Sequence, residues 1–231
     1  MNEVNSKQFT HLKIHTQYSI CEGALKTSDL AEYCKTNKVR AAGLCDSNNL
    51  CGALDFSESL SKYKTQPIIG TQINIDYKGH IGKIPLFAKD LEGYKNLIKL
   101  SSKSFLDIKE NEEPHCKFDD IEKNYKGLIL LTGSIDSLIG KLFFKNLTDE
   151  ILSLLKKISK IFNDNCYVEI QRHNDDGEKL FEKFILNVSN KLGFPIIATQ
   201  EVFYLDKDMH EAHDAFLCIG EKTYVNVKDR R

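Results

Sequence analysis

Short apolar runs alternate with longer amphipathic stretches along the chain, which predicts a mixed α/β fold. Strands are predicted at Phe9–Ile14, Ala41–Cys45, Pro67–Ile75, Ile84–Ala88, Gly127–Thr132, Cys166–Ile170 and Pro195–Thr199. Helices are predicted at Ser28–Asn37, Ala53–Leu60, from the cap Asp90 through Leu100, Ile151–Phe162, Glu178–Leu192, and from near Asp208. Roughly six or seven βα units indicate a barrel or a wound sheet, whose chemistry gathers at the carboxyl ends of the strands.

The domain organisation is simple. The polar residues 1–8 are predicted to form an N-terminal tail, and 9–231 to form one domain without a convincing internal boundary. The charged, proline-broken stretch Lys109–Pro114 is predicted to be an exposed loop.

Composition narrows the class of protein. The net charge is −1, so any DNA-related function needs a local basic patch or a neighbouring domain. Seven cysteines include no Cys-x-x-Cys pair, and no apolar run reaches the roughly 20 residues of a membrane helix. We therefore expect a soluble cytoplasmic protein with mostly buried thiols and no membrane partner.

The segment Phe9–Ser19 resembles a metal-binding strand with one ligand replaced. Side chains alternate along a strand, so His11, Lys13 and His15 share one face. Two imidazoles suit a divalent metal, whereas an ammonium group has no lone pair and repels the ion.

Further polar clusters fall where the predicted strands end. They are Cys21-Glu22-Gly23, Asp46-Ser47-Asn48-Asn49, Gln72, Ser134, Arg172-His173 and Gln200-Glu201. Any one of them is commonly a cap or turn residue. Histidines and carboxylates that converge from several strand ends are, however, what a multinuclear metal hydrolase needs.

These segments, taken in order, resemble the N-terminal PHP (polymerase and histidinol phosphatase) domain of bacterial DNA polymerase III alpha subunits. The resemblance runs from about residue 9 to 220 and rests on Phe9–Ser19 with Glu22–Ala24, Leu44–Ala53, Pro67–Gln72, Leu86–Ser101, Gly127–Gly133, Glu169–His173, Ala198–Val202 and Glu211–Asp214. It implies a distorted seven-stranded (β/α) barrel of the PHP type, with metal ligands converging at one mouth. Residues 9–231 would then be the PHP domain, cut at its C-terminal edge relative to the full polymerase.

The resemblance also implies a degenerate metal site. Metal-intact relatives have ligands where this chain has Lys13, Ser47, Gln72, Ser134 and Phe203. The vestigial candidates that could still coordinate are His15, Glu22, Asp46, His173 and Glu201. A trinuclear cluster needs about nine ligands, and even a lost supporting contact weakens binding roughly 10–100-fold. We expect no cofactor, with a residual Zn, Mn or Mg ion as the alternative, and Lys13 paired with Asp46 or Glu22.

Three other sets of residues have plainer interpretations. Asp206-Lys207-Asp208 resembles the paired carboxylates of a polymerase, but its place before Met209 suits a helix cap. His210 and His213 share one helix face, where the resemblance implies a structural pair. Cys45 and Cys51 are expected to be buried rather than redox-active.

The function implied is that of a PHP region in a DNA-replicating polymerase alpha subunit, with no catalytic residues in this segment. Its expected role is structural and partner-docking. The expected partners are the rest of the alpha subunit, the proofreading exonuclease subunit and, indirectly, DNA. The alternatives are a metal-dependent phosphoesterase or 3′–5′ exonuclease, a free-standing scaffold for the exonuclease subunit, and a truncated product without a role. A reading frame continuing past residue 231 into a palm domain would favour the first interpretation.

Overall fold

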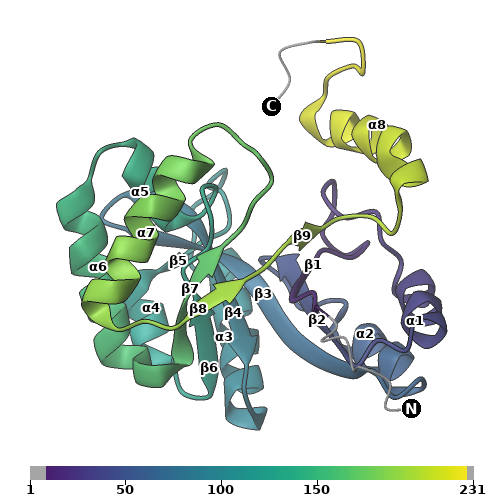
Figure 1. Cartoon of the computed structure of the whole chain (residues 1–231), viewed down its shortest axis with the longest axis horizontal. Coiled ribbons are helices and arrows are strands. Elements are labelled where there is room, and N and C mark those ends of the chain that lie inside the picture. The colour runs from purple at the N-terminus through teal and green to yellow at the C-terminus, as the bar shows by residue number, and fades with distance from the viewer. Residues whose placement is uncertain (1–8, 228–231) are drawn as a thin grey trace, which may run out of the picture. The chain divides into compact units, whose positions relative to one another are not determined.

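The computed structural model describes residues 9–227, so the predicted tail at 1–8 lies outside the described part (Figure 1). The chain divides into two compact units. Unit 1 comprises the described parts of Met1–Leu44 and Glu201–Arg231 together with Cys51–Ile68. Unit 2 comprises Cys45–Leu50 and Ile69–Gln200. The prediction of a mixed α/β fold is confirmed.

Unit 1 is built around the short strand β1, which pairs in parallel with a strand on each side. Ile14 lies opposite Leu44 of β2, and Lys13 lies opposite Glu201 of β9. The elements assigned to this unit, including the first part of β2, are β1 (Lys13–Ile14), α1 (Thr27–Thr36), β2 (Ala41–Ser47), α2 (Ala53–Ser61), β9 (Glu201–Val202), the 3₁₀ turn η2 (Lys207–Met209) and α8 (His210–Glu221).

Unit 2 holds a mixed sheet. Strand β4 pairs antiparallel with β3 and with β6, whereas β6–β7, β7–β8 and β3–β5 are parallel pairs. The strands are β3 (Gln66–Tyr77, mostly in this unit), β4 (His80–Ala88), β5 (Cys116–Lys117), β6 (Leu128–Leu131), β7 (Cys166–Ile170) and β8 (Ile196–Ala198). The helices are α3 (Leu91–Leu106), α4 (Phe118–Lys123), α5 (Leu138–Phe144), α6 (Thr148–Phe162), η1 (Asn163–Asn165) and α7 (Glu178–Leu192).

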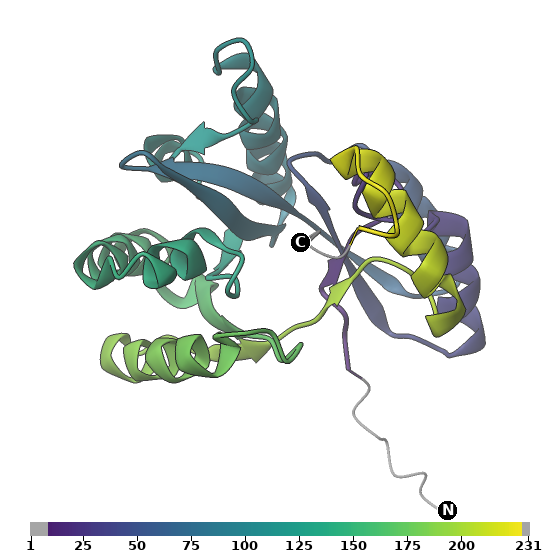
Figure 2. The same cartoon turned by 90° about the horizontal axis from the view of Figure 1, so that it is seen from above.

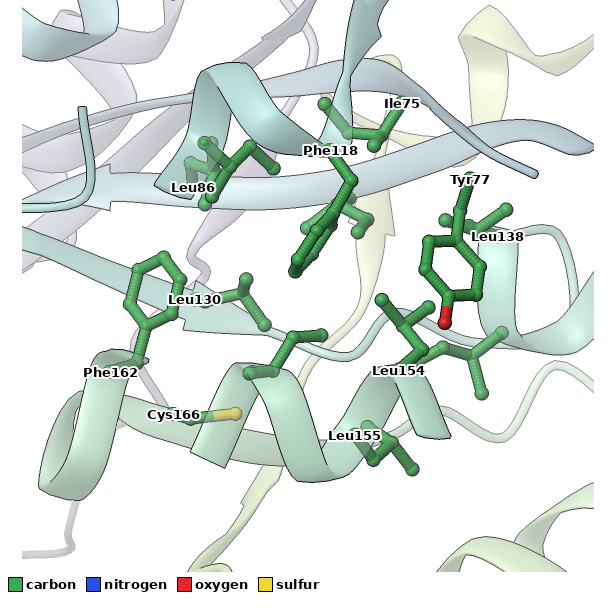
Figure 3. Close-up of a cluster of buried hydrophobic side chains, with 14 of the residues drawn as sticks. Ile75, Tyr77, Leu86, Phe118, Leu130, Leu138, Leu154, Leu155, Phe162 and Cys166 are labelled. Carbon is green, nitrogen blue, oxygen red and sulfur yellow. The ribbon is translucent and has the colours of Figure 1, made fainter. Parts of the chain in front are cut away.

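The core of unit 2 forms where the apolar face of α6 meets the sheet. Leu154, Leu155 and Ile158 are fully buried, at the helical spacing that the sequence predicted. Each buried leucine or isoleucine contributes roughly 1.5–3 kcal/mol. Figure 3 shows the surrounding side chains, which include Ile75, Tyr77, Leu86, Phe118, Leu130, Leu138, Phe162 and Cys166.

A two-residue hairpin joins β3 to β4, and this turn was missed at the sequence level. Lys78 and Gly79 both have positive φ, 55° and 81°, as the favoured two-residue hairpin turns require. The Gly79 N–H also donates to Asp76 Oδ1 at 2.7 Å. The predicted strands stopped at Ile75 and resumed at Ile84, so both were too short.

Several predicted boundaries are confirmed, and others need correction. β7 and α7 have the predicted bounds, and Asp90 caps α3 by accepting a hydrogen bond from the Gly93 N–H at 2.9 Å. Ser28 is not a helix cap, because α1 already begins at Thr27. The first strand is confined to Lys13–Ile14.

Within residues 9–227, no helix has the length and apolar character needed to cross a membrane.

Candidate functional site

An ion pair between a buried lysine of β1 and a partly buried glutamate of β9 joins these two strands of unit 1. The Lys13 side chain is among the largest fully buried ones, and its Nζ pairs with Glu201 Oε1. His15 Nε2 lies 2.5 Å from the second oxygen, Oε2, of the same carboxylate. The parallel β1–β9 pairing sets Lys13 opposite Glu201, and the His15 N–H donates to the Val202 carbonyl at 2.8 Å. Glu201 was not among the partners expected for Lys13.

The charges of this cluster keep Glu201 ionised. Burial alone raises the pKa of Glu201, but the Lys13 ammonium and the hydrogen bond from His15 outweigh burial. The net result is a pKa far below the ordinary value of 4.5. Both carboxylate oxygens are therefore charged and already engaged by Lys13 and His15.

An aromatic stack continues from this cluster toward α8. The Phe203 ring stacks on His15, with centroids 4.6 Å apart, and on His213, with centroids 5.8 Å apart. His213 is buried, and its Nε2–H donates to the Glu22 carbonyl oxygen at 2.7 Å. Phe203 thus supplies packing at a position where the resemblance implied a metal ligand.

The remaining sequence candidates belong to unit 2. Asp46, Gln72 and Ser134 are buried, whereas His173 is exposed. The backbone carbonyl of each buried residue accepts a hydrogen bond: Asp46 from Thr71 Oγ1 at 2.6 Å, Gln72 from Asn48 N at 2.8 Å, and Ser134 from Ser137 Oγ at 2.6 Å. The His173 N–H donates to Glu178 Oε1 at 2.8 Å, so the first residue of α7 holds the backbone of the loop that precedes the helix.

Ser47 sits at the end of β2, where a single residue fixes the turn. Asn48 has a φ of 56°, and its Oδ1 accepts a hydrogen bond from the Asn74 N–H at 2.8 Å. Ser101 Oγ donates to the Asn48 carbonyl at 2.9 Å. This turn holds the end of β2 against β3 and α3 within unit 2.

Sequence reasoning missed a buried carboxylate in β7. Glu169 is 1% exposed, and its Oε1 accepts hydrogen bonds from Gln171 Nε2 at 2.7 Å and from Thr199 Oγ1. The Glu169 N–H donates to Thr132 Oγ1 at 3.0 Å. The signal was available, because Glu169 is the one acidic residue in an otherwise apolar predicted strand.

The helix-cap prediction for Asp206 is confirmed, whereas the prediction of two buried cysteines holds for one of them. Asp206 Oδ1 accepts from the Asp208 N–H at 3.0 Å and caps η2, which confirms the helix-cap prediction. Of the two predicted buried cysteines, Cys45 is buried but Cys51 is exposed, so the prediction for Cys51 is wrong.

The donor chemistry of unit 1 is a poor match for a metal ion. Lys13 and Phe203 cannot ligate, and both Glu201 oxygens already have partners. Throughout residues 9–227, no three His, Cys, Asp or Glu side chains are grouped so that they could hold a metal.

Comparison with known protein families matches residues 11–173 to the PHP domain. The chain belongs to the PHP domain family. Its curated relatives include DNA polymerase III subunit alpha of Rickettsia bellii (strain RML369-C), 36% identical over 225 residues and 97% of this chain. The same subunit of Caulobacter vibrioides (strain NA1000 / CB15N) is 33% identical over 239 residues and 100% of this chain.

The chain spans 19% of the Rickettsia subunit and 21% of the Caulobacter subunit. It is thus a PHP domain homologous to the N-terminal region of DNA polymerase III subunit alpha.

Solved structures support the fold assignment. A putative metal-dependent phosphoesterase from Bifidobacterium adolescentis aligns with a TM-score of 0.60 at 11% identity, over 85% of this chain and 88% of that chain. An amidohydrolase from Chromobacterium violaceum aligns with a TM-score of 0.56 at 10% identity, over 90% and 97% of the two chains. The likeness confirms the PHP-type α/β fold.

Proposed function

We propose that this PHP domain is the organising and partner-docking region of a DNA polymerase III alpha subunit, without a working metal cluster. The homology to alpha subunits along nearly the whole chain supports this placement. The partners proposed are the remainder of the subunit, the proofreading exonuclease subunit and, through the polymerase body, DNA, all in the cytoplasm.

The observation that carries the proposal is the sharing of Glu201 between Lys13 and His15. A metal ion bound to that carboxylate would have to displace the Lys13 ammonium or lie beside it in a buried setting, where like charges repel strongly. The ammonium already supplies the positive charge that balances Glu201. The ion pair thus does the structural work that a metal does in an intact cluster.

The chemistry of the parent protein is proposed to lie outside this segment. Nucleotide addition by two-metal phosphoryl transfer needs paired carboxylates, and Asp206 instead caps η2. The segment alone is therefore expected not to polymerise DNA.

Metal content and hydrolysis test the proposal directly. The purified chain is dialysed against Zn²⁺, Mn²⁺ or Mg²⁺, analysed for bound metal, and assayed on a phosphomonoester and a 3′-recessed primer. We expect substoichiometric metal and no metal-dependent hydrolysis, either in the native chain or in Lys13→His. Stoichiometric metal together with metal-dependent turnover in the native chain would overturn the metal-free role.

Docking is tested separately by pull-down with the proofreading exonuclease subunit from the same source. Retention at micromolar concentration is expected. Failure to bind at that concentration would remove the docking role while leaving the metal question untouched.

A second candidate is a metal-dependent phosphoesterase. The observation that favours it is that unit 2 keeps two buried carboxylates, Asp46 and Glu169, which are of ligand type. The hydrolysis assay above decides between the two candidates.

A further inference from the structure

Helix α3 of unit 2 is apolar on two faces. Its inner face buries Leu97 and Leu100 completely, as a helix packed on a sheet should. On the outside, Leu91 is 67% exposed, Ile98 43% and Phe105 51%. Figure 2 shows α3 as the long helix at the top of the view, well away from α6 and α7 of the same unit.

The exposed apolar residues recur on one side of the helix, with Ser101 and Ser102 between Ile98 and Phe105. Leu91, Ile98 and Phe105 follow one another at seven-residue intervals, and the half-buried Tyr94 lies between the first two. That spacing sets all four on one face of a helix, along about 21 Å. Single exposed apolar side chains are ordinary, but a stripe along four turns marks a surface that packs against something.

The stripe carries a positive flank. Lys95 and Lys99 are exposed beside it, and neither has an acidic partner among residues 9–227. Lys103 differs, because its Nζ pairs with Asp107 at 2.8 Å and with Asp120 at 2.7 Å. Glu92 lies on the same flank, so one acid faces two free lysines. The net charge beside the apolar stripe is therefore positive.

We propose that this face of α3, which we call the α3 stripe (Leu91, Tyr94, Ile98 and Phe105 with Lys95 and Lys99), docks an amphipathic helix of a partner protein. The partner helix has apolar residues at i, i+3 or i+4 and i+7 against the stripe, and acidic residues against the two lysines. About four turns of helix match the length of the stripe. This inference rests on the docking role proposed above and assigns it a surface.

The test uses the purified chain and a displayed library of helical peptides about 16 residues long. The library varies both the charge and the apolar pattern of the peptides, so neither is imposed by its design. We expect the enriched peptides to share one apolar stripe with acidic residues beside it. A charge-reversed copy of the best peptide, with Lys in place of its acids, should bind at least tenfold more weakly.

Variants locate the binding surface. The double variant Ile98→Ala with Phe105→Ala should bind the best peptide at least tenfold more weakly than the native chain does. The double variant Lys95→Glu with Lys99→Glu should no longer bind the best peptide more tightly than the charge-reversed copy. The matched control is Leu180→Ala on α7, because Leu180 is exposed to the same 67% as Leu91. Unchanged urea midpoints establish that each variant is folded.

The possible outcomes separate cleanly. Enriched peptides without acidic residues, or peptides that bind all variants equally, would overturn the proposal. Self-association of the chain that is lost in the Ile98 and Phe105 variant would make a second copy the occupant, and would overturn it too. If the exonuclease subunit binds the native chain and every α3 variant with the same affinity, the docking role is supported but the α3 stripe is not the docking surface.

Discussion

His15 and Glu201 lie 186 residues apart in the sequence, yet His15 Nε2 and Glu201 Oε2 are 2.5 Å apart in unit 1. The second oxygen of Glu201 is held by the buried Lys13. One carboxylate from near the end of the chain thus balances a cation and orients an imidazole from its beginning.

Loss of the Glu201 charge should destabilise the protein markedly. Glu201→Gln removes a counter-ion from a lysine that is 1% exposed, and breaking a buried pair from one side costs roughly 3–5 kcal/mol. Urea unfolding of native and variant chains measures the difference.

The matched control replaces both partners. Lys13→Met with Glu201→Leu removes the buried charge altogether, and such replacements are often neutral or stabilising. We expect the double variant to recover most of the unfolding free energy that Glu201→Gln loses. A double variant as unstable as Glu201→Gln would show that Glu201 acts mainly through His15.

Stability should fall in acid because of Glu201. Its pKa is lowered in the folded state, so the folded protein binds that proton more weakly than the unfolded chain. The contribution is complete above the ordinary pKa of 4.5 and declines as the pH falls toward the folded value. Urea midpoints from neutral pH to about pH 3 should drop less steeply for Glu201→Gln than for the native chain. Parallel curves for the two proteins would contradict this assignment.

Two glycines of unit 2 should respond very differently to alanine. A Cβ on Gly93 would lie 1.8 Å from the Gly127 carbonyl oxygen, which accepts a hydrogen bond from the Lys89 N–H. Gly93→Ala must therefore shift the start of α3, which should lower the free energy of unfolding by about 2–3 kcal/mol. Gly79 has open space around it but a φ of 81°, so Gly79→Ala costs only about 1 kcal/mol of backbone strain. Equal losses in thermal or urea unfolding would refute the contrast.

Thiol reactivity should follow burial. Burial raises the pKa of Cys166 to about 12, and burial with the nearby Asp120 raises that of Cys116 to about 12. Thiolate is the reactive form, so both should resist a disulfide reagent at pH 8 until the protein unfolds. Cys51 is exposed and should react among the fastest. Loss of a rapid phase in Cys51→Ser checks the assignment, whereas fast labelling of Cys116 or Cys166 would contradict it.

The sequence predicted elements best where local pattern and packing agree. Strand β7 and helix α7 have the predicted bounds, since apolar spacing and turn residues mark the same limits. The β3–β4 turn was missed because Lys78 adopts a positive φ, which a lysine rarely signals. Strand β1 was predicted too long, since regular pairing is confined to Lys13, which lies opposite β9, and Ile14, which lies opposite both β2 and β9.

The candidate site was predicted in composition but not in pairing. The sequence predicted Asp46 or Glu22 as the partner of Lys13, whereas the structure pairs Lys13 with Glu201. That pairing depends on the β1–β9 register, which no local pattern encodes. Glu169 was overlooked because one of its donors, Thr199, lies 30 residues away in the sequence. The metal content of the site remains a prediction for the assays above.

The parallel pairing of β1 with β2 on one side and β9 on the other has a consequence for the order of folding. Lys13 emerges from the ribosome early, but its β9 partner arrives only after residue 200 has been made. Unit 2 lies almost wholly within that interval, so its core can form while unit 1 still lacks an edge of its sheet. Until β9 is synthesised, the Lys13 ammonium lacks its Glu201 counter-ion, so the sheet of unit 1 is completed only after residues 201–202 have been made.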